Sequence, residues 1–131
     1  MEIIATQKYI LVSPKKLRPI ADMAKKLKPS EAIARLPFIG KMAAADLIKV
    51  IKTAIANGVN RGIAADTLIF KEIQIGEGPR LKRGQPVSRG QWHPIKKRMA
   101  HIRVILQTIE KSKVKDQKAR VKGETKNGTK N

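Results

Sequence analysis

Cysteine is absent from this chain of 131 residues, and aromatic side chains are rare, with one tryptophan, one tyrosine and two phenylalanines. Without cysteine the chain can form neither a disulfide nor a thiolate zinc site, which fits a reducing compartment. No apolar run is long enough to span a bilayer, and no basic region precedes the apolar residues at the N-terminus, as a signal peptide would require. Because a membrane-surface helix also needs aromatics on its apolar face, we expect no membrane partner.

Acidic residues are scarce as well. The chain has 29 lysines and arginines against 10 acidic residues, and its formal net charge of +19 points to nucleic acid as the partner. The carboxylates of Asp22, Asp46, Asp66 and Glu72 show no paired spacing suited to acid–base catalysis, and there is no phosphate-cradling glycine loop. The two histidines have no carboxylate or thiol near them in the sequence. We therefore expect no enzyme, no cofactor and no metal site.

The hydrophobic pattern predicts an α+β fold, with three helices packed on a small antiparallel sheet and a long extended β-hairpin arm. Strands are expected over residues 2–12, 67–75 and 101–109, and helices over 14–28, 31–36 and 41–57. We expect residues 1–109 to form a single globular domain from which the arm, residues 79–99, protrudes. Residues 110–131 are lysine-rich with little apolar surface, so they are predicted to be a disordered tail.

Local signals refine the helices. Ser13 and Ser30 precede two of them and are expected to cap their free N–H groups. The pair Asn57-Gly58 is expected to end the longest helix. The buried stripe of that helix is predicted as Ala44, Leu47, Ile48, Ile51, Ala54 and Ile55. The phenylalanines and three methionines are also predicted to fill the core: Phe38, Phe70, Met23, Met42 and Met99.

The stretch from Pro79 to Arg98 has a composition of its own. It contains no acidic residue, and its cations are Arg80, Lys82, Arg83, Arg89, Lys96, Lys97 and Arg98. Its glycines and prolines exclude a long helix, and its few apolar residues are too scattered to bury a face. Since a two-stranded hairpin is marginal in water, an ordered arm needs a partner, and the charge indicates a polyanion. The flanking strands can continue into it as one antiparallel ribbon, reaching on the order of 30 Å from the domain.

Several short pieces occur together in an order and spacing typical of one family. They are Ser13-Pro14 with Lys16 and Arg18, Ala54-Ile55-Ala56-Asn57, Glu77-Gly78-Pro79, Lys82-Arg83, Pro86, Gly90, Lys97-Arg98 and His101-Ile102. From about Ile4 to Leu106 the chain resembles bacterial-type large-subunit ribosomal protein twenty-two. Each piece is weak alone, and their combination is specific.

The resemblance implies an α+β domain on the outer face of the large ribosomal subunit, with a hairpin that runs through ribosomal RNA (rRNA) to the wall of the nascent-chain exit tunnel. It implies a role in early subunit assembly and a hairpin near the macrolide-binding region. The implied partners are large-subunit rRNA, neighbouring large-subunit proteins and the nascent peptide in the tunnel, and no homo-oligomer is expected. The implied location is cytoplasmic and ribosome-bound, with an organellar ribosome left open.

The resemblance and the charge together assign site residues. The expected rRNA contacts are Ser13, Lys15, Lys16, Arg18, Arg80, Lys82, Arg83, Arg89, Gly90, Trp92, Lys96, Lys97, Arg98 and His101. The expected exit-tunnel tip is Gln85, Pro86, Val87, Ser88, Arg89, Gly90, Gln91 and Trp92. Members of the family usually have arginines where this chain has Val87 and Gln91, and a small residue where it has Trp92. We expect Trp92 to stack on a base or to lie at the tunnel wall.

A second function fits the same residues. An architectural protein can grip duplex DNA with a basic β-arm and insert a proline or apolar wedge at its tip, and Pro86 or Pro94 could take that part. Co-purification discriminates between the two, because a ribosomal protein sediments with large subunits whereas a DNA-bending protein stays with the nucleoid.

Overall fold

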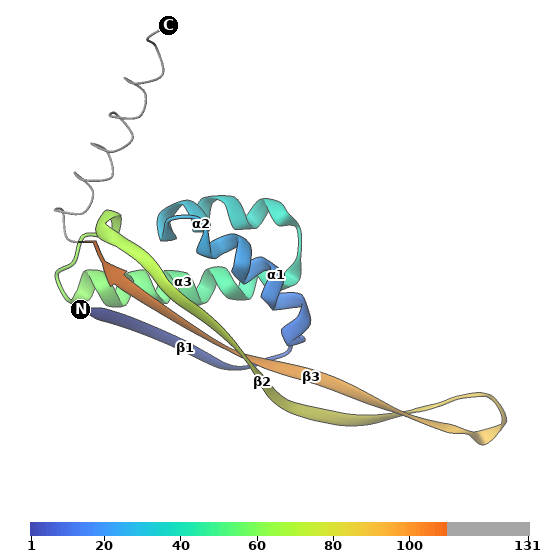
Figure 1. Cartoon of the computed structure of the whole chain (residues 1–131). Coiled ribbons are helices and arrows are strands. Elements are labelled where there is room, and N and C mark those ends of the chain that lie inside the picture. Colours follow the sequence, from blue (N-terminus) through green and yellow to red (C-terminus); the bar gives the residue numbers. More distant parts are fainter. Residues whose placement is uncertain (110–131) are drawn as a thin grey trace, which may run out of the picture.

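The computed structural model of the protein describes residues 1–109. A three-stranded antiparallel sheet forms the base of the molecule. The strands are β1 (Glu2–Ile10), β2 (Leu68–Pro86) and β3 (Trp92–Thr108), in the order β1-β3-β2. The last strand therefore lies between the other two (Figure 1). Alternate residues of β3 are buried, among them Ile102 and Val104, because successive side chains of a strand point to opposite faces.

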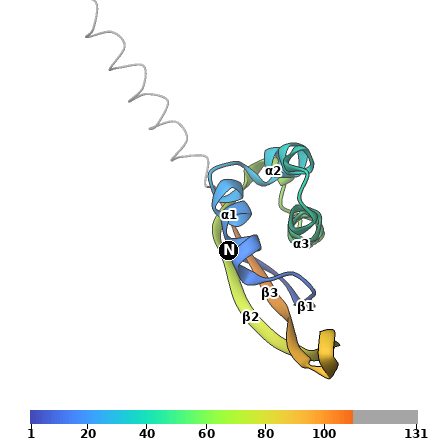
Figure 2. The ribbon, with the colours of Figure 1, turned by 90° about the vertical axis from the view of Figure 1, so that its right-hand side faces the viewer.

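Three helices cover one face of this sheet, as two perpendicular views show (Figures 1 and 2). They are α1 (Pro14–Lys25), α2 (Pro29–Arg35) and α3 (Met42–Asn60), with a short 3₁₀ turn at Leu36–Ile39. The core lies between the helices and the inner sheet face, where the largest fully buried side chains are Ile3, Leu17, Ile20, Leu36, Leu47, Ile51, Leu68, Ile102, Val104 and Leu106. The predicted α+β class is confirmed. No helix among the described residues is long and apolar enough to cross a membrane.

The buried stripe of the longest helix, α3, agrees with the prediction, but the helix extends beyond its predicted end. Of the six expected residues, four are buried and two are half-buried, and Ala43 and Val50 are buried in addition. The helix does not stop at Asn57-Gly58, because Gly58 fits into the core as a helical residue. A Cβ there would lie 3.0 Å from methyl carbons of both Ile3 and Leu68. The glycine thus serves close packing between α3 and the sheet.

Several side chains predicted to be buried are exposed. Phe38 is 89% exposed, Met42 is 83% exposed and Met23 is 54% exposed, whereas Phe70 packs at the edge of the core. Phe38 lies in the 3₁₀ turn, where Leu36 fills the core instead. The caps differ too: the side chain of Ser13 makes no capping hydrogen bond, and α2 begins at Pro29, one residue before the expected cap.

The arm is a continuation of β2 and β3 beyond the end of β1 (Figure 1). The pairing of these strands continues from Leu68 opposite Thr108 to Pro86 opposite Trp92, with irregularities between Phe70 and Glu72 and between Glu77 and Arg80. The expected single ribbon is therefore present, and its outer part extends away from the helices. The predicted disorder of residues 110–131 lies outside the described residues.

Candidate nucleic-acid interface

Like charges face each other across the arm. The register places Arg80 opposite Arg98 and Lys82 opposite Lys96, and directly opposed residues share one face of the ribbon. We call these four residues the cation ladder. One of these cations has an acidic partner: Nη2 of Arg80 forms an ion pair with Oε2 of Glu77 at 3.6 Å, and because both side chains are exposed this pair contributes little. Two successive like-charge pairs destabilise a free hairpin, so this face is suited to a surface that supplies negative charge.

The opposite face of the arm is mixed in character. It carries the pairs Leu81–Lys97, Arg83–Ile95 and Gln85–His93. The Arg83 side chain donates a hydrogen bond to the neighbouring Lys82 carbonyl. Each cation on this face is thus opposed by an apolar residue, and the dense charge is confined to the ladder face.

The tip reverses the chain in five residues, 87–91, between the two strands. The Val87 N–H donates to the Gln91 carbonyl at 2.9 Å, which closes the turn. Arg89 and Gly90 both have left-handed backbone, with φ of 60° and 67°. Glycine adopts this conformation freely, but an arginine there costs about 1–2 kcal/mol. The turn holds Arg89 exposed at the outermost end of the arm.

Trp92 is the first residue of β3, and its side chain extends across the arm to Gly84 of β2. A Cβ added at Gly84 would fall 1.8 Å from Cζ2 of the indole, so the ring rests directly over the glycine α-carbon. The side chain is nevertheless 67% exposed. One ring face is thereby covered by the arm backbone while most of the indole stays accessible, which is the arrangement expected of a stacking platform.

His101 stands at the root of the arm and is oriented by a residue that sequence reasoning passed over. The Tyr9 N–H donates to Nδ1 of His101 at 3.0 Å, and the two rings meet edge to face with centroids 5.1 Å apart. Tyr9 is 63% exposed and has a left-handed φ of 60°, at a bulge in the pairing of β1 with β3. Because Nδ1 accepts this bond, Nε2 is the ring nitrogen left to contact a ligand.

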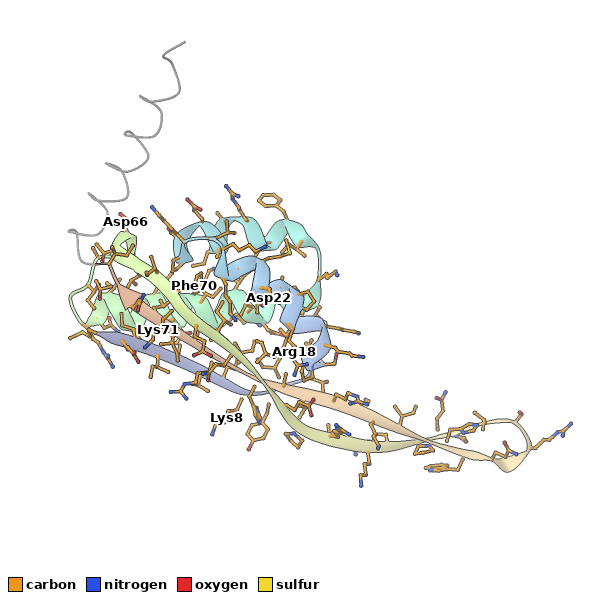
Figure 3. The ribbon with its side chains drawn as sticks, viewed as in Figure 1. Lys8, Arg18, Asp22, Asp66, Phe70 and Lys71 are labelled. Atoms are coloured by element: carbon orange, nitrogen blue, oxygen red, sulfur yellow. The ribbon has the colours of Figure 1, made fainter. Side chains whose placement is uncertain are left out.

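The predicted contacts of the first helix divide into two groups. Ser13 and Lys16 come together with β3 at a groove of about 690 Å³, which we call the junction groove. Its lining residues are Leu11, Val12, Ser13, Lys16, Lys41, Met42, Ala43, Lys96, Lys97 and Arg98. Arg18 lines a separate hollow near Asp22 and β2 (Figure 3), and Lys15 lines neither. Nothing in the expected list pointed to Leu11 or Met42.

The sheet face away from the helices is a weaker candidate surface. It carries a shallow depression lined by Ile4, Thr6, Lys8, Gln74, Ile75, Gly76, His101 and Arg103. Figure 3 shows Lys8 on the side of β1 away from the helices. Within residues 1–109, no three histidine or acidic side chains gather in a way that could hold a metal ion.

Comparison with known proteins gives one consistent result. The sequence profile of the family described as "Ribosomal protein L22p/L17e" matches residues 5–107. The chain is 39% identical over 107 residues to the large ribosomal subunit protein uL22 of Akkermansia muciniphila, covering 81% of this chain and 96% of the relative. It is 42% identical over 108 residues to uL22 of Desulfatibacillum aliphaticivorans, covering 82% and 99%. It is 38% identical over 107 residues to uL22 of Mycoplasma capricolum, covering 81% and 96%.

Proposed function

The chain belongs to the ribosomal protein L22p/L17e family, and we propose that, as a constituent of the large ribosomal subunit, it binds large-subunit rRNA mainly through its arm. The observation that carries this proposal is the cation ladder. Its register brings like charges directly opposite each other twice in succession, which is unfavourable until phosphates neutralise them. Phosphate contacts of this kind supply affinity and position rather than sequence readout.

The finer parts of the proposal concern the tip and the partners. Residues 85–92 lie at the far end of the ribbon, so they contribute nothing to the domain core and are free to meet another surface. In the ribosome they line the exit tunnel and meet the nascent peptide, while the globular domain contacts rRNA and neighbouring large-subunit proteins. The protein supports early assembly as a single copy in cytoplasmic ribosomes. Family membership and the length of the arm support these assignments.

The role is structural, as it is for the family, and no catalytic step is part of it. The DNA-binding alternative has no separate observation in its favour. A sucrose gradient of a lysate distinguishes the two functions: the chain is expected to sediment with large subunits and to dissociate only at high salt. Sedimentation with DNA, unchanged by ribonuclease and abolished by deoxyribonuclease, would contradict the ribosomal assignment.

Salt dependence tests the role of the cation ladder directly. The measurement is the affinity for deproteinised large-subunit rRNA across a series of salt concentrations. Changing all four ladder residues to alanine is expected to reduce the slope of log K against log salt by about 3. A matched variant removes four exposed lysines of the helical layer: Lys26, Lys28, Lys49 and Lys52. Equal changes of slope in the two variants would show that only total charge matters and would refute the assignment to the arm.

A further inference from the structure

The junction groove combines two kinds of surface, exposed apolar side chains and a dense group of cations. Its apolar residues are Leu11, Val12, Met42 and Ala43. Met42 and Leu11 remain 83% and 59% exposed, although apolar surface left in water is unfavourable. Its volume of about 690 Å³ lies within the range typical of small-ligand sites.

Five cations line the same groove, and they come from three separate parts of the chain. Lys16 comes from α1, Lys41 from the residue before α3, and the remaining three, Lys96, Lys97 and Arg98, from β3. No carboxylate is among the lining residues. A ligand that fits must therefore present an apolar body and negative charge side by side. A nucleotide does so, because its base has two apolar faces and its phosphates are anionic.

The groove is also continuous with the cation ladder. Lys96 and Arg98 belong to both, so an RNA strand that follows the phosphates along the arm arrives at the groove without leaving the charged surface. A base inside a duplex is stacked and cannot reach the apolar floor, whereas a bulged or looped base can be turned out and bound.

We propose that the junction groove holds one unpaired nucleotide of the RNA bound by the arm, with its base against Leu11 and Met42 and its phosphates near Lys41 and Lys96. This inference rests on the proposed RNA-binding function and makes it more specific. The arm then supplies affinity through charge, and the groove selects RNA that offers an extruded base.

The test uses the full chain and two RNA hairpins of equal length, one fully paired and one with a single-nucleotide bulge. The unmodified protein is expected to bind the bulged hairpin about fivefold to tenfold more tightly, as moving one face of a base from water onto apolar side chains allows. Leu11→Ala combined with Met42→Ala is expected to remove this preference and to leave affinity for the paired hairpin within about twofold.

The control combines Met23→Ala with Val59→Ala, which removes two exposed apolar side chains outside the groove. This variant should keep the preference for the bulge. Equal binding of both hairpins by the unmodified protein, with a steep salt slope, would overturn the groove proposal and leave RNA binding by the arm intact. Binding of neither hairpin nor rRNA would instead overturn the proposed function. Capture of oligoglutamate that depends on Leu11 and Met42 would assign the groove to acidic peptides and overturn its assignment to RNA.

Discussion

One strand, β3, serves two opposite purposes along its length. From Ala100 to Leu106 its alternate residues are fully buried beneath the helices, whereas every residue from Trp92 to Arg98 is exposed. The backbone pairing with β2 continues through both halves. The difference between the two halves therefore lies in their side chains. Alternate side chains of residues 100–106 pack in a hydrophobic core, whereas residues 92–98 are held only by backbone hydrogen bonds to β2.

The comparison shows how a protein can carry an ordered arm without a core in it. The register is fixed in the buried half of the sheet, at pairs such as Ile75–Ile102. The backbone pairing of β2 with β3 then carries that register outward into the arm, past the irregularity after Glu77. Backbone hydrogen bonds contribute little net stability in water, so the arm is held mainly by its root. It can then present charge at densities that a self-contained fold would not tolerate.

Amide hydrogen exchange should reveal the largest difference between the two halves. In the free protein, amides of β3 near Val104 are expected to exchange only through global unfolding, which costs about 5–15 kcal/mol in domains of this kind. Amides near Ile95 should exchange through local opening at a small fraction of that free energy. Comparable protection in the two halves without RNA would show that the arm has stability of its own.

A matched pair of substitutions in β3 sharpens the comparison. Ile102 is fully buried and Ile95 is 40% exposed. Ile102→Ala is expected to lower the free energy of unfolding by about 2–5 kcal/mol because it leaves a cavity in the core. Ile95→Ala should cost less than about 1 kcal/mol. Chemical denaturation measures both, and similar losses at the two positions would contradict the division of the strand.

The fold could be predicted from sequence because its signals are periodic. Alternation marked the strands, helical spacing marked the stripe around Leu47 and Ile51, and the absence of acids between two strands marked the arm. Phe38 shows the limit of this reasoning. Hydrophobicity alone predicted burial, but Phe38 lies in the 3₁₀ turn Leu36–Ile39, which ends at Gly40 with a φ of 65°, and its side chain is 89% exposed.

The candidate site was only partly predictable for a different reason. The cations of the arm are visible in the sequence, but the pairing of Arg80 with Arg98 depends on the irregularity after Glu77, which no local pattern announces. The junction groove needs Leu11 and Met42 to approach from distant segments. Leu11 was assigned to a strand that in fact ends at Ile10. The roles of the predicted contact residues in RNA binding stay predictions.

The packing of Trp92 on Gly84 offers a smaller effect with a clear optical signal, because the chain has a single tryptophan. Gly84→Ala would place a Cβ 1.8 Å from the indole, so the ring must move away. We expect a red-shifted fluorescence spectrum, since the displaced ring meets more water, and a loss of stability below about 1 kcal/mol. Gly90→Ala at the tip is a control with nothing within 4 Å of the new Cβ; its left-handed backbone can cost stability but should leave the spectrum unchanged.

Trp92→Ala should likewise change the unfolding free energy of the free protein by less than about 1 kcal/mol, because the ring packs on the arm and not on the core. In assembled ribosomes the same substitution is expected to alter the chemical reactivity of bases near the tip. A loss of several kcal/mol in the free protein would place the ring in the core and contradict the extended position of the arm.

The smallest effect is expected at the end of the sheet farthest from the arm, where Glu2 and Lys71 bring opposite charges together. Glu2 of β1 forms an ion pair and hydrogen bond with Lys71 of β2, and this contact holds the pKa of the Glu2 carboxyl below its ordinary value of 4.5. A lowered pKa in the folded state means that the contact stabilises the protein above pH 4.5 and is lost as pH falls through the folded-state value. Glu2→Gln should therefore lower the melting temperature slightly at neutral pH, and the difference from the unmodified protein should vanish in acid. Because both side chains are about half exposed, high salt should also erase the difference.

Glu72→Gln, which removes a neighbouring carboxyl with no ion pair among the described residues, is the control. A difference for Glu2→Gln that persists unchanged at pH 2 would show that its effect arises from packing rather than from charge.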